Sequence, residues 1–406
     1  MGDFSQNGIV STLHDFKTKS TDEIEKELLE FSKERKMELI LPCLYSELEG
    51  EALPKIVSEI SKTKYLNHII IGLDKANKDQ AKDAWKFFKK LKTDFTILWN
   101  DGPRLQKLDK ELKEKSLAPN QPGKGRNVWY CLGMSIARDT ARSVALHDCD
   151  IKTYDRRMLA KLFYPVVNPV FNFEFCKGFY PRIANEKMNG RVARLLVAPL
   201  LIALEKTIGS SEYLQFMKSF KYPLSGEFSF RRNVLSEFRI SSDWGIEVGI
   251  LSEMQRNFSP NNICQVDLAD TYDHKHQDLS LDDETKGLSK MSIDIIKTFI
   301  KKLATQGNSF SRETFRSLKA TYYRCALDMI DIYRSDATMN GLKFDSHTEE
   351  KAVELFAINI MKAGDDFYVN PMDTPFIPTW SRVKSAIPDF LTKLNKAVSE
   401  DNKDNS

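Results

Sequence analysis

The sequence predicts an α/β fold in which a mixed, mainly parallel sheet is flanked by helices and followed by a helical C-terminal region. Three observations support this prediction. Short apolar runs alternate with segments of helical periodicity up to about residue 160, each run ends at a turn signal, and from about residue 285 only helical patterns recur. Strands that alternate with helices generally pair in parallel, with the helices covering both faces.

The first half of the chain gives the clearest elements. Residues 1–35 are polar, and TDEIEKELLEFSKER predicts one helix there. A short apolar strand is expected from Glu38 to Leu41, ending at Pro42. NHIIIGLD and DFTILWNDGP follow as strands, separated by the helical pattern KDQAKDAWKFFKKLKT, and Ser143 to Leu146 reads as a further strand.

The second half is less regular. Between about residues 160 and 285, short strands and loops surround one clear helix near 191–206. SKMSIDIIKTFIKKLATQG then places its apolar residues on one helical face, and two more amphipathic patterns follow. The tail SEDNKDNS is expected to be disordered.

Composition excludes several classes of function. The 406 residues carry 60 basic and 57 acidic side chains, a net charge of +3, which gives no strong field for nucleic acid or an anionic membrane. No signal-peptide run or membrane-length apolar stretch is present, so a soluble, cytoplasmic protein is expected. The cysteines form no CxxC pair and are expected to be reduced thiols; they are Cys43, Cys131, Cys149, Cys176, Cys264 and Cys325.

Polar side chains gather at the ends of the predicted strands. In open α/β sheets, ligands bind beyond the carboxyl ends of the strands, so these positions are candidates for a binding site. The residues concerned are Ser46, Glu47, Asp74, Asn100, Asp148 and Asp150.

The pair Asp148 and Asp150 follows the strand that ends at Leu146. In an extended chain, residues two apart point to the same side, so both carboxylates could reach one ligand. Mg²⁺ or Mn²⁺ binds carboxylate and phosphate oxygens together, which makes a metal-bound diphosphate the favoured ligand. A solvated turn is the alternative interpretation.

Two helix starts lie beside glycines and carry cations. Gly123 and Lys124 open one helix, where an anion would be favoured by the helix N-terminus and by the lysine. Gly190 precedes Arg191 and Arg194, and arginine suits bidentate recognition of phosphate or carboxylate. The alternatives are an ordinary loop with a solvated lysine and a helix cap with two surface arginines.

Two further segments carry groups that need a partner. His274 and His276 would face the same side of an extended segment and could complete a metal site begun by carboxylates, although a surface loop with chance histidines competes. Glu247 lies in an apolar segment, where a carboxylate requires either a structural salt bridge or a task.

The order of these segments resembles the glucosyl-3-phosphoglycerate synthases, which are retaining glycosyltransferases of the GT-A (Rossmann-like) fold related to the mannosyl-3-phosphoglycerate synthases. The resemblance covers roughly residues 37 to 280. It rests on LPCLYSE, GLD, PGKGRNVW, HDCDI, NGRVARLLVAPLL, PLSGEFSFRR, DWGIEVGIL and VDLADTYDHKH.

The resemblance implies transfer of glucose from a nucleoside-diphosphate-glucose to the 2-hydroxyl of 3-phosphoglycerate, with Mg²⁺ or Mn²⁺ held by Asp150 and His274. Asp150, Glu247 and Lys124 would be catalytic. The acceptor would contact Asn189, Gly190, Arg191, Val192, Ala193 and His276. The donor would contact Pro42, Leu44, Ser46, Glu47, Asp74, Gly123, Lys124, Asp148, Cys149, Leu224, Ser225 and Gly226.

On this basis the chain divides into an N-terminal arm and helix (1–35), a nucleotide-sugar-binding half (36–160), an acceptor-binding and metal-completing half (161–284), a helical region (285–395) and a disordered tail (396–406). Family members are often dimers, so a homodimer is a further expectation, with the helices after residue 285 as its candidate interface.

Several positions depart from the family pattern. Ser46 stands at the first of two positions that are usually acidic, Ala193 where threonine is usual, and His276 where asparagine is usual. The DHKH loop is one residue longer, which leaves the choice between His274 and His276 as metal ligand open. A mannosyl-3-phosphoglycerate synthase using GDP-mannose, a sugar-nucleotidyltransferase and a non-catalytic nucleotide-sugar-binding protein remain alternatives.

Overall fold

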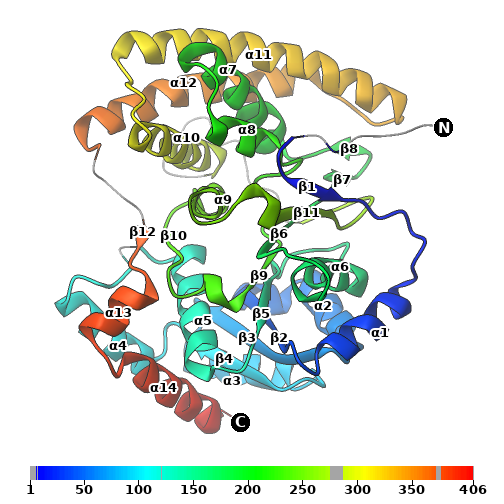
Figure 1. Cartoon of the computed structure of the whole chain (residues 1–406), viewed down its shortest axis with the longest axis vertical. Helices are drawn as coiled ribbons and strands as arrows, with labels where there is room; N and C mark the ends of the chain where they lie inside the picture. Colours follow the sequence, from blue (N-terminus) through cyan, green and yellow to red (C-terminus); the bar gives the residue numbers. More distant parts are fainter. Residues whose placement is uncertain (1–5, 7, 120, 275–286, 372–375, 406) are drawn as a thin grey trace.

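An eight-stranded sheet forms the centre of the computed structural model, which describes residues 6, 8–119, 121–274, 287–371 and 376–405 (Figure 1). The strand order is β1-β11-β6-β9-β5-β2-β3-β4, and only β9 runs antiparallel to its neighbours. The predicted mixed, mainly parallel sheet is therefore confirmed. The strands are β1 (Ser11–Leu13), β2 (Met37–Leu44), β3 (Leu66–Asp74), β4 (Phe95–Trp99), β5 (Ser143–Leu146), β6 (Phe175–Phe179), β9 (Phe228–Arg231) and β11 (Ile263–Asp267).

Side chains alternate along the central strands into two separate cores. Ile40 of β2 packs into one core, whereas Leu39 and Leu41 pack into the other, as the two-residue period of a strand requires. Because both faces are buried, these strands read as continuous apolar runs in the sequence. The flanking helices of the first half are α1 (Thr21–Phe31), α2 (Ala52–Ile60), α3 (Lys78–Phe88), α4 (Pro103–Glu114), α5 (Lys124–Arg138) and α6 (Arg156–Val167).

The second half adds short strand pairs and most of the remaining helices. Strands β7 (Ile183–Ala184) and β8 (Lys187–Met188) form one pair, and β10 (Ile240–Ser241) and β12 (Phe376–Ile377) form another. The helix expected near 191–206 begins as a π-helix, η2 (Val192–Val197), and continues as α7 (Ala198–Ile208). The other helical elements are α8 (Glu212–Lys218), α9 (Ile246–Asn257), α10 (Gly287–Thr305), α11 (Arg312–Met339), α12 (Ser346–Val369), α13 (Trp380–Ala386), α14 (Phe390–Asn405) and the 3₁₀ turns η1 (Tyr45–Glu49), η3 (Arg232–Val234) and η4 (Pro260–Asn262).

The helical C-terminal region divides into two groups that cover different parts of the molecule (Figure 1). Helices α10, α11 and α12 pack around η2 and α7, whereas α13 and α14 pack on α4, α5 and β4. Trp380 of α13 stacks on Trp129 of α5 with ring centroids 4.0 Å apart and donates from its indole to the Trp129 carbonyl at 3.0 Å. None of the helices in the described part of the chain has the length together with the apolar character that a bilayer span requires.

Two local predictions are wrong. Strand β2 continues through Pro42 to Leu44 instead of ending at the proline. Ile40 accepts from the His147 N–H on the β5 side, so Pro42, two residues on, faces that same side, where pairing with β5 has ended. The missing N–H therefore breaks no ladder, and β2 stays paired with β3 as far as Asp74.

The tail expected to be disordered is instead, as far as Asn405, the last part of α14. Its order comes from specific partners. Arg104 of α4 binds Asp401 at 2.5 Å and Asp404 at 2.7 Å, and Asn402 exchanges two hydrogen bonds with the backbone of Ile97 in the edge strand β4. The side-chain amide of Asn402 thus satisfies the Ile97 backbone groups as a neighbouring strand would. The surrounding sequence is rich in polar residues and does not indicate this role.

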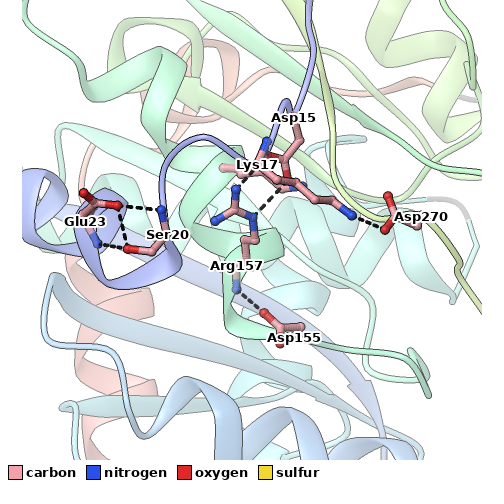
Figure 2. A network of polar contacts seen from close by, with 8 residues as sticks. Asp15, Lys17, Ser20, Glu23, Asp155, Arg157 and Asp270 are labelled. Carbon is pink, nitrogen blue, oxygen red and sulfur yellow. Dashed lines mark hydrogen bonds and ion pairs between the residues drawn. The ribbon is translucent and has the colours of Figure 1, made fainter.

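The N-terminal arm is fixed to the sheet by strand β1 and by ion pairs (Figure 2). Asp15 accepts from Arg157 and Lys161 of α6, at 2.7 and 2.8 Å, and Lys17 pairs with Asp270. Although burial disfavours the carboxylate, the two cations hold the pKa of Asp15 well below its usual range. The arm therefore contacts the segment after β11, which leads to His274.

We expect Asn402→Ala to lower the free energy of unfolding by about 1–3 kcal/mol, because the Ile97 N–H and carbonyl would both lose their partners. Urea denaturation measures this. Asn405→Ala is the matched control, since among the described residues the Asn405 side chain donates to a carbonyl of its own helix, that of Asp401. Equal stability of the two variants would contradict the edge-capping role.

Candidate active site

The candidate site lies at the carboxyl ends of the parallel strands, as the sequence predicts. Asp74 is the last residue of β3, and Asp148 and Asp150 follow β5. Asn127 of α5 donates to the Asp74 carboxylate at 2.9 Å and to the Gly72 carbonyl at 2.7 Å. Burial is the main cause that raises the pKa of Asp74 to about 6.

Lys124 forms the charged centre of the site. Its ammonium lies 2.7 Å from Asp148 and 3.2 Å from Glu247, which stands in the first turn of α9. Burial would lower the pKa of Lys124, but the two carboxylates outweigh it and raise the pKa far above its usual range. The lysine is therefore a permanent cation, and Glu247 has the partner that its apolar surroundings require.

Two glycines make this arrangement possible. Gly123 has a φ of 137°, a conformation that side chains disfavour, and it directs the start of α5 toward the strand ends. Gly226 passes so close to the pair that a Cβ atom there would lie 2.2 Å from Asp148 Oδ2 and 2.9 Å from Lys124 Nζ. Gly226 therefore serves close approach and Gly123 serves the backbone conformation, and the lysine is not the solvated loop residue of the alternative interpretation.

Asp148 and Asp150 point away from the core, while Cys149 between them is buried in it. His274 Nδ1 lies 3.4 Å from Asp150 Oδ2. Two ligands that each lie about 2.1 Å from one divalent ion are separated by about 3–4 Å, so this pair fits a shared Mg²⁺ or Mn²⁺. Within the described residues no group of three His, Cys, Asp or Glu side chains forms a metal site.

A cavity of about 440 Å³ adjoins this centre. Residues predicted to bind the donor and residues predicted to bind the acceptor both line it, so the structure brings the two predicted groups together. The predicted residues that line it are Gly123, Lys124, Asp148, Asn189, Gly190, Arg191, Val192, Ala193, Leu224, Gly226, Glu247 and His274.

Other predicted residues lie outside the cavity. Leu44 is exposed at the end of β2, where it pairs with Asp74, with Pro42 before it and Ser46 and Glu47 in η1. The Ser225 hydroxyl turns inward and donates to the Gly178 carbonyl at 2.7 Å, so it contributes no side chain to the site. His276 lies outside the described residues.

Several residues that line the cavity were not predicted from the sequence. Tyr180, Arg182, Tyr222, Trp244 and Lys290 line the cavity, and they come from four separate segments. The aromatic and basic character of the YPRIANEKMNGR stretch was the available signal for Arg182. Tyr180 opens the same stretch, whereas Tyr222, Trp244 and Lys290 stand singly in other segments, where no local pattern groups them.

Arg191 and Arg194, which follow Gly190, differ in their surroundings. Arg191 lines the cavity, whereas Arg194 is buried and hydrogen-bonds the carbonyls of Met188 and Asn189. Both pair with Glu349 of α12. The predicted pair thus separates into one residue facing the cavity and one that anchors the loop.

Comparison of the sequence with known proteins identifies relatives of this chain. No family model matches the chain. The chain is 44% identical to the glucosyl-3-phosphoglycerate synthase of Persephonella marina over 404 residues, covering all of both proteins, and 37% identical to that of Methanococcoides burtonii over 406 residues, covering 99% of this chain and 98% of the relative.

Solved structures support the same fold. The crystal structure of glucosyl-3-phosphoglycerate synthase from Mycobacterium tuberculosis with Mn²⁺, uridine diphosphate and glucosyl-3-phosphoglycerate superposes with a TM-score of 0.53 at 21% identity, over 74% of this chain and 89% of that one. Its complex with Mg²⁺ and uridine diphosphate gives the same score. On the full-length sequence similarity, the chain belongs to the glucosyl-3-phosphoglycerate synthase family.

Proposed function

We propose that this protein transfers glucose from a nucleoside-diphosphate-glucose, with UDP-glucose as the expected donor, to the 2-hydroxyl of 3-phosphoglycerate with retention of configuration. The observation that carries the proposal is the Lys124 ammonium, held between Asp148 and Glu247 in a cavity that it shares with Arg191. A fixed cation beside an arginine suits a diphosphate donor and a small anionic acceptor in adjacent places.

The donor would lie along the strand ends. Its nucleoside would occupy the edge formed by Pro42, Leu44, Ser46, Glu47 and Asp74, with the diphosphate at Gly123 and Lys124. The sugar would lie between Glu247 and the Leu224–Gly226 loop. The backbone around Cys149 and Ser225, rather than their buried side chains, would contact the donor.

A divalent ion, Mg²⁺ or Mn²⁺, would be held by Asp150 and His274, and when bound it would neutralise the leaving diphosphate. Burial disfavours the Asp150 carboxylate, but its contact with His274 lowers the pKa of Asp150 overall, so the carboxylate is ionised. Such an anion is the form that a hard cation requires.

The acceptor would bind at Asn189, Gly190, Arg191, Val192 and Ala193, with His276 contributing from outside the described residues. Arg191 supplies the charge for a phosphate or carboxylate. Gly190, with a φ of 77°, turns the chain so that η2 begins at the cavity wall.

The charge balance favours a front-face displacement. The acceptor oxygen would bond to the anomeric carbon as the bond from that carbon to phosphate breaks, and the departing phosphate oxygen would take the hydroxyl proton. Lys124 already faces the place where charge develops, so little reorganisation is needed. Asp148 and Glu247 are both ion-paired with Lys124, which disfavours either as a covalent nucleophile.

We also propose that the enzyme is cytoplasmic and works as a homodimer. All six cysteines are free and buried, in keeping with a reducing compartment. Exposed apolar side chains on α11 and α12, among them Ile332, Met339 and Ile358, offer a surface for a second copy.

Lys124→Ala is expected to lower kcat about 10²–10³-fold, because the fixed cation at the leaving group is lost. Release of UDP from UDP-glucose and 3-phosphoglycerate measures the rate. Lys107→Ala, at an exposed position of α4, is the control and should match the wild type. A Lys124→Ala rate within threefold of the wild type would remove the lysine from the mechanism.

Asp150→Ala should lose nearly all activity, and His274→Ala should raise the half-saturating Mg²⁺ concentration at least about tenfold. Metal titration of the same assay measures both effects. His276→Ala is the comparison that decides between the two histidines, and it should leave the metal requirement unchanged. Full activity of Asp150→Ala in the presence of EDTA would exclude the proposed metal site.

Asp74→Asn should stabilise the protein by about 1–2 kcal/mol at pH 7.5 and by only about a third as much at pH 4.5. A carboxyl whose folded pKa, about 6, exceeds its ordinary 3.8 makes stability fall as pH rises between these values, and asparagine removes that cost. Urea denaturation at both pH values tests this, with exposed Asp83→Asn as control. The same variant should raise the KM for UDP-glucose; equal stabilisation at both pH values would contradict the assignment.

A further inference from the structure

Glu349 stands in the first turns of α12, far in sequence from the acceptor loop that it contacts. Its side chain is almost completely buried. One carboxylate oxygen accepts from Arg191 Nε at 2.9 Å, and the other accepts from Arg194 Nη2 at 3.0 Å. A single buried carboxylate therefore joins both arginines of the loop.

The two arginines are held differently. The Arg194 side chain is 9% exposed, lies over the ring of Tyr333, and donates to the carbonyls of Met188 and Asn189. Arg194 consequently fixes the backbone directly before Gly190. The Arg191 side chain is 35% exposed and lines the cavity.

The contact with Arg191 uses one particular edge of its guanidinium. Glu349 accepts from Nε, and the two Nη groups have no hydrogen-bond partner among the described residues. A guanidinium carries five donors in a planar fork, so the two Nη groups remain available to a phosphate or carboxylate. Glu349 thus restrains the rotation of the fork without occupying its end.

Charge supports the same interpretation. Arg191 and Arg194 lie one turn apart and repel each other, and Glu349 offsets one of the two charges. The group of three keeps one positive charge, which is the charge that a small anion needs. The π-helix η2, a form often found at functional sites, begins directly after Arg191 and contains Arg194.

We propose that Glu349 is a positioning residue for the acceptor: through Arg191 and Arg194 it orients the guanidinium that binds the phosphorylated acid. The inference rests on the proposed function, because it assumes that an anionic acceptor occupies this cavity. It also gives the C-terminal helices a part in acceptor recognition, since Glu349 belongs to α12.

The test compares Glu349→Gln with Glu253→Gln in the full-length enzyme with Mg²⁺. Glu253 is a matched control, because it is also a buried carboxylate near two arginines, Arg239 at 3.6 Å and Arg256 at 3.8 Å, and it does not line the cavity. Glu349→Gln should raise the KM for 3-phosphoglycerate about tenfold or more and leave the KM for UDP-glucose within about twofold. Glu253→Gln should change neither.

A double-mutant cycle with Arg191→Gln separates positioning from general destabilisation. If Glu349 acts through Arg191, the double variant should bind 3-phosphoglycerate no more weakly than the weaker single variant, as measured by calorimetry with UDP present. Fully additive losses, or an unchanged KM in Glu349→Gln, would overturn the proposal. Should Glu349→Gln fail to fold, Glu349→Asp, which withdraws the charge by one methylene, is judged by the same criteria.

The outcomes distinguish this inference from the proposed function. A wild-type protein that consumes UDP-glucose only when 3-phosphoglycerate is present, together with an unaffected Glu349→Gln, would overturn the positioning role alone. A wild type that does not use 3-phosphoglycerate would overturn the proposed function, and the positioning role with it.

Discussion

The site depends on one interaction, the ammonium of Lys124 between the carboxylates of Asp148 and Glu247. These groups come from the start of α5, the end of β5 and the first turn of α9, so one charge joins three elements that are distant in sequence. Without the cation, two partly buried carboxylates would face each other, and like charges in such surroundings repel strongly. The geometry of the cavity therefore follows from local charge balance in a chain whose net charge is small.

The antiparallel direction of strand β9 explains why the loop before it, which contains Gly226, lies at the site. Phe228, the first residue of β9, pairs with Leu146, the last residue of β5. The loop before β9 consequently reaches the same edge of the sheet as Asp148, which a parallel strand at this place would not allow. Gly226 then fits against the Lys124–Asp148 pair because it lacks a Cβ atom. The antiparallel direction of β9 thus brings Gly226 next to Lys124.

The sequence predicted those features that depend on local pattern. Asp74 and Asp148 stand at strand ends, and alternation along an extended segment turned Asp150 outward and Cys149 into the core. Partners across long separations were not accessible in the same way. Nothing near Glu349 indicates that it reaches Arg191, and the polar tail gave no sign that Asn402 would pair with a strand edge. Local periodicity predicts elements, whereas tertiary contacts decide which polar residues are buried.

The division of the C-terminal region extends this argument. Helix α12 supplies Glu349 to Arg191 and Arg194, whereas α14 packs on α4, α5 and the edge strand β4. Strand β12 lies between α12 and α13 in sequence and pairs with β10. Ser241 of β10 lies close to α5, because a Cβ atom on Gly125 would stand 2.2 Å from the Ser241 carbonyl oxygen. The first turn of α5, which carries Lys124, is therefore held in place by backbone packing as well as by the ion pairs of the lysine. The ammonium can occupy its position before any substrate arrives, which is the preorganisation that electrostatic catalysis requires.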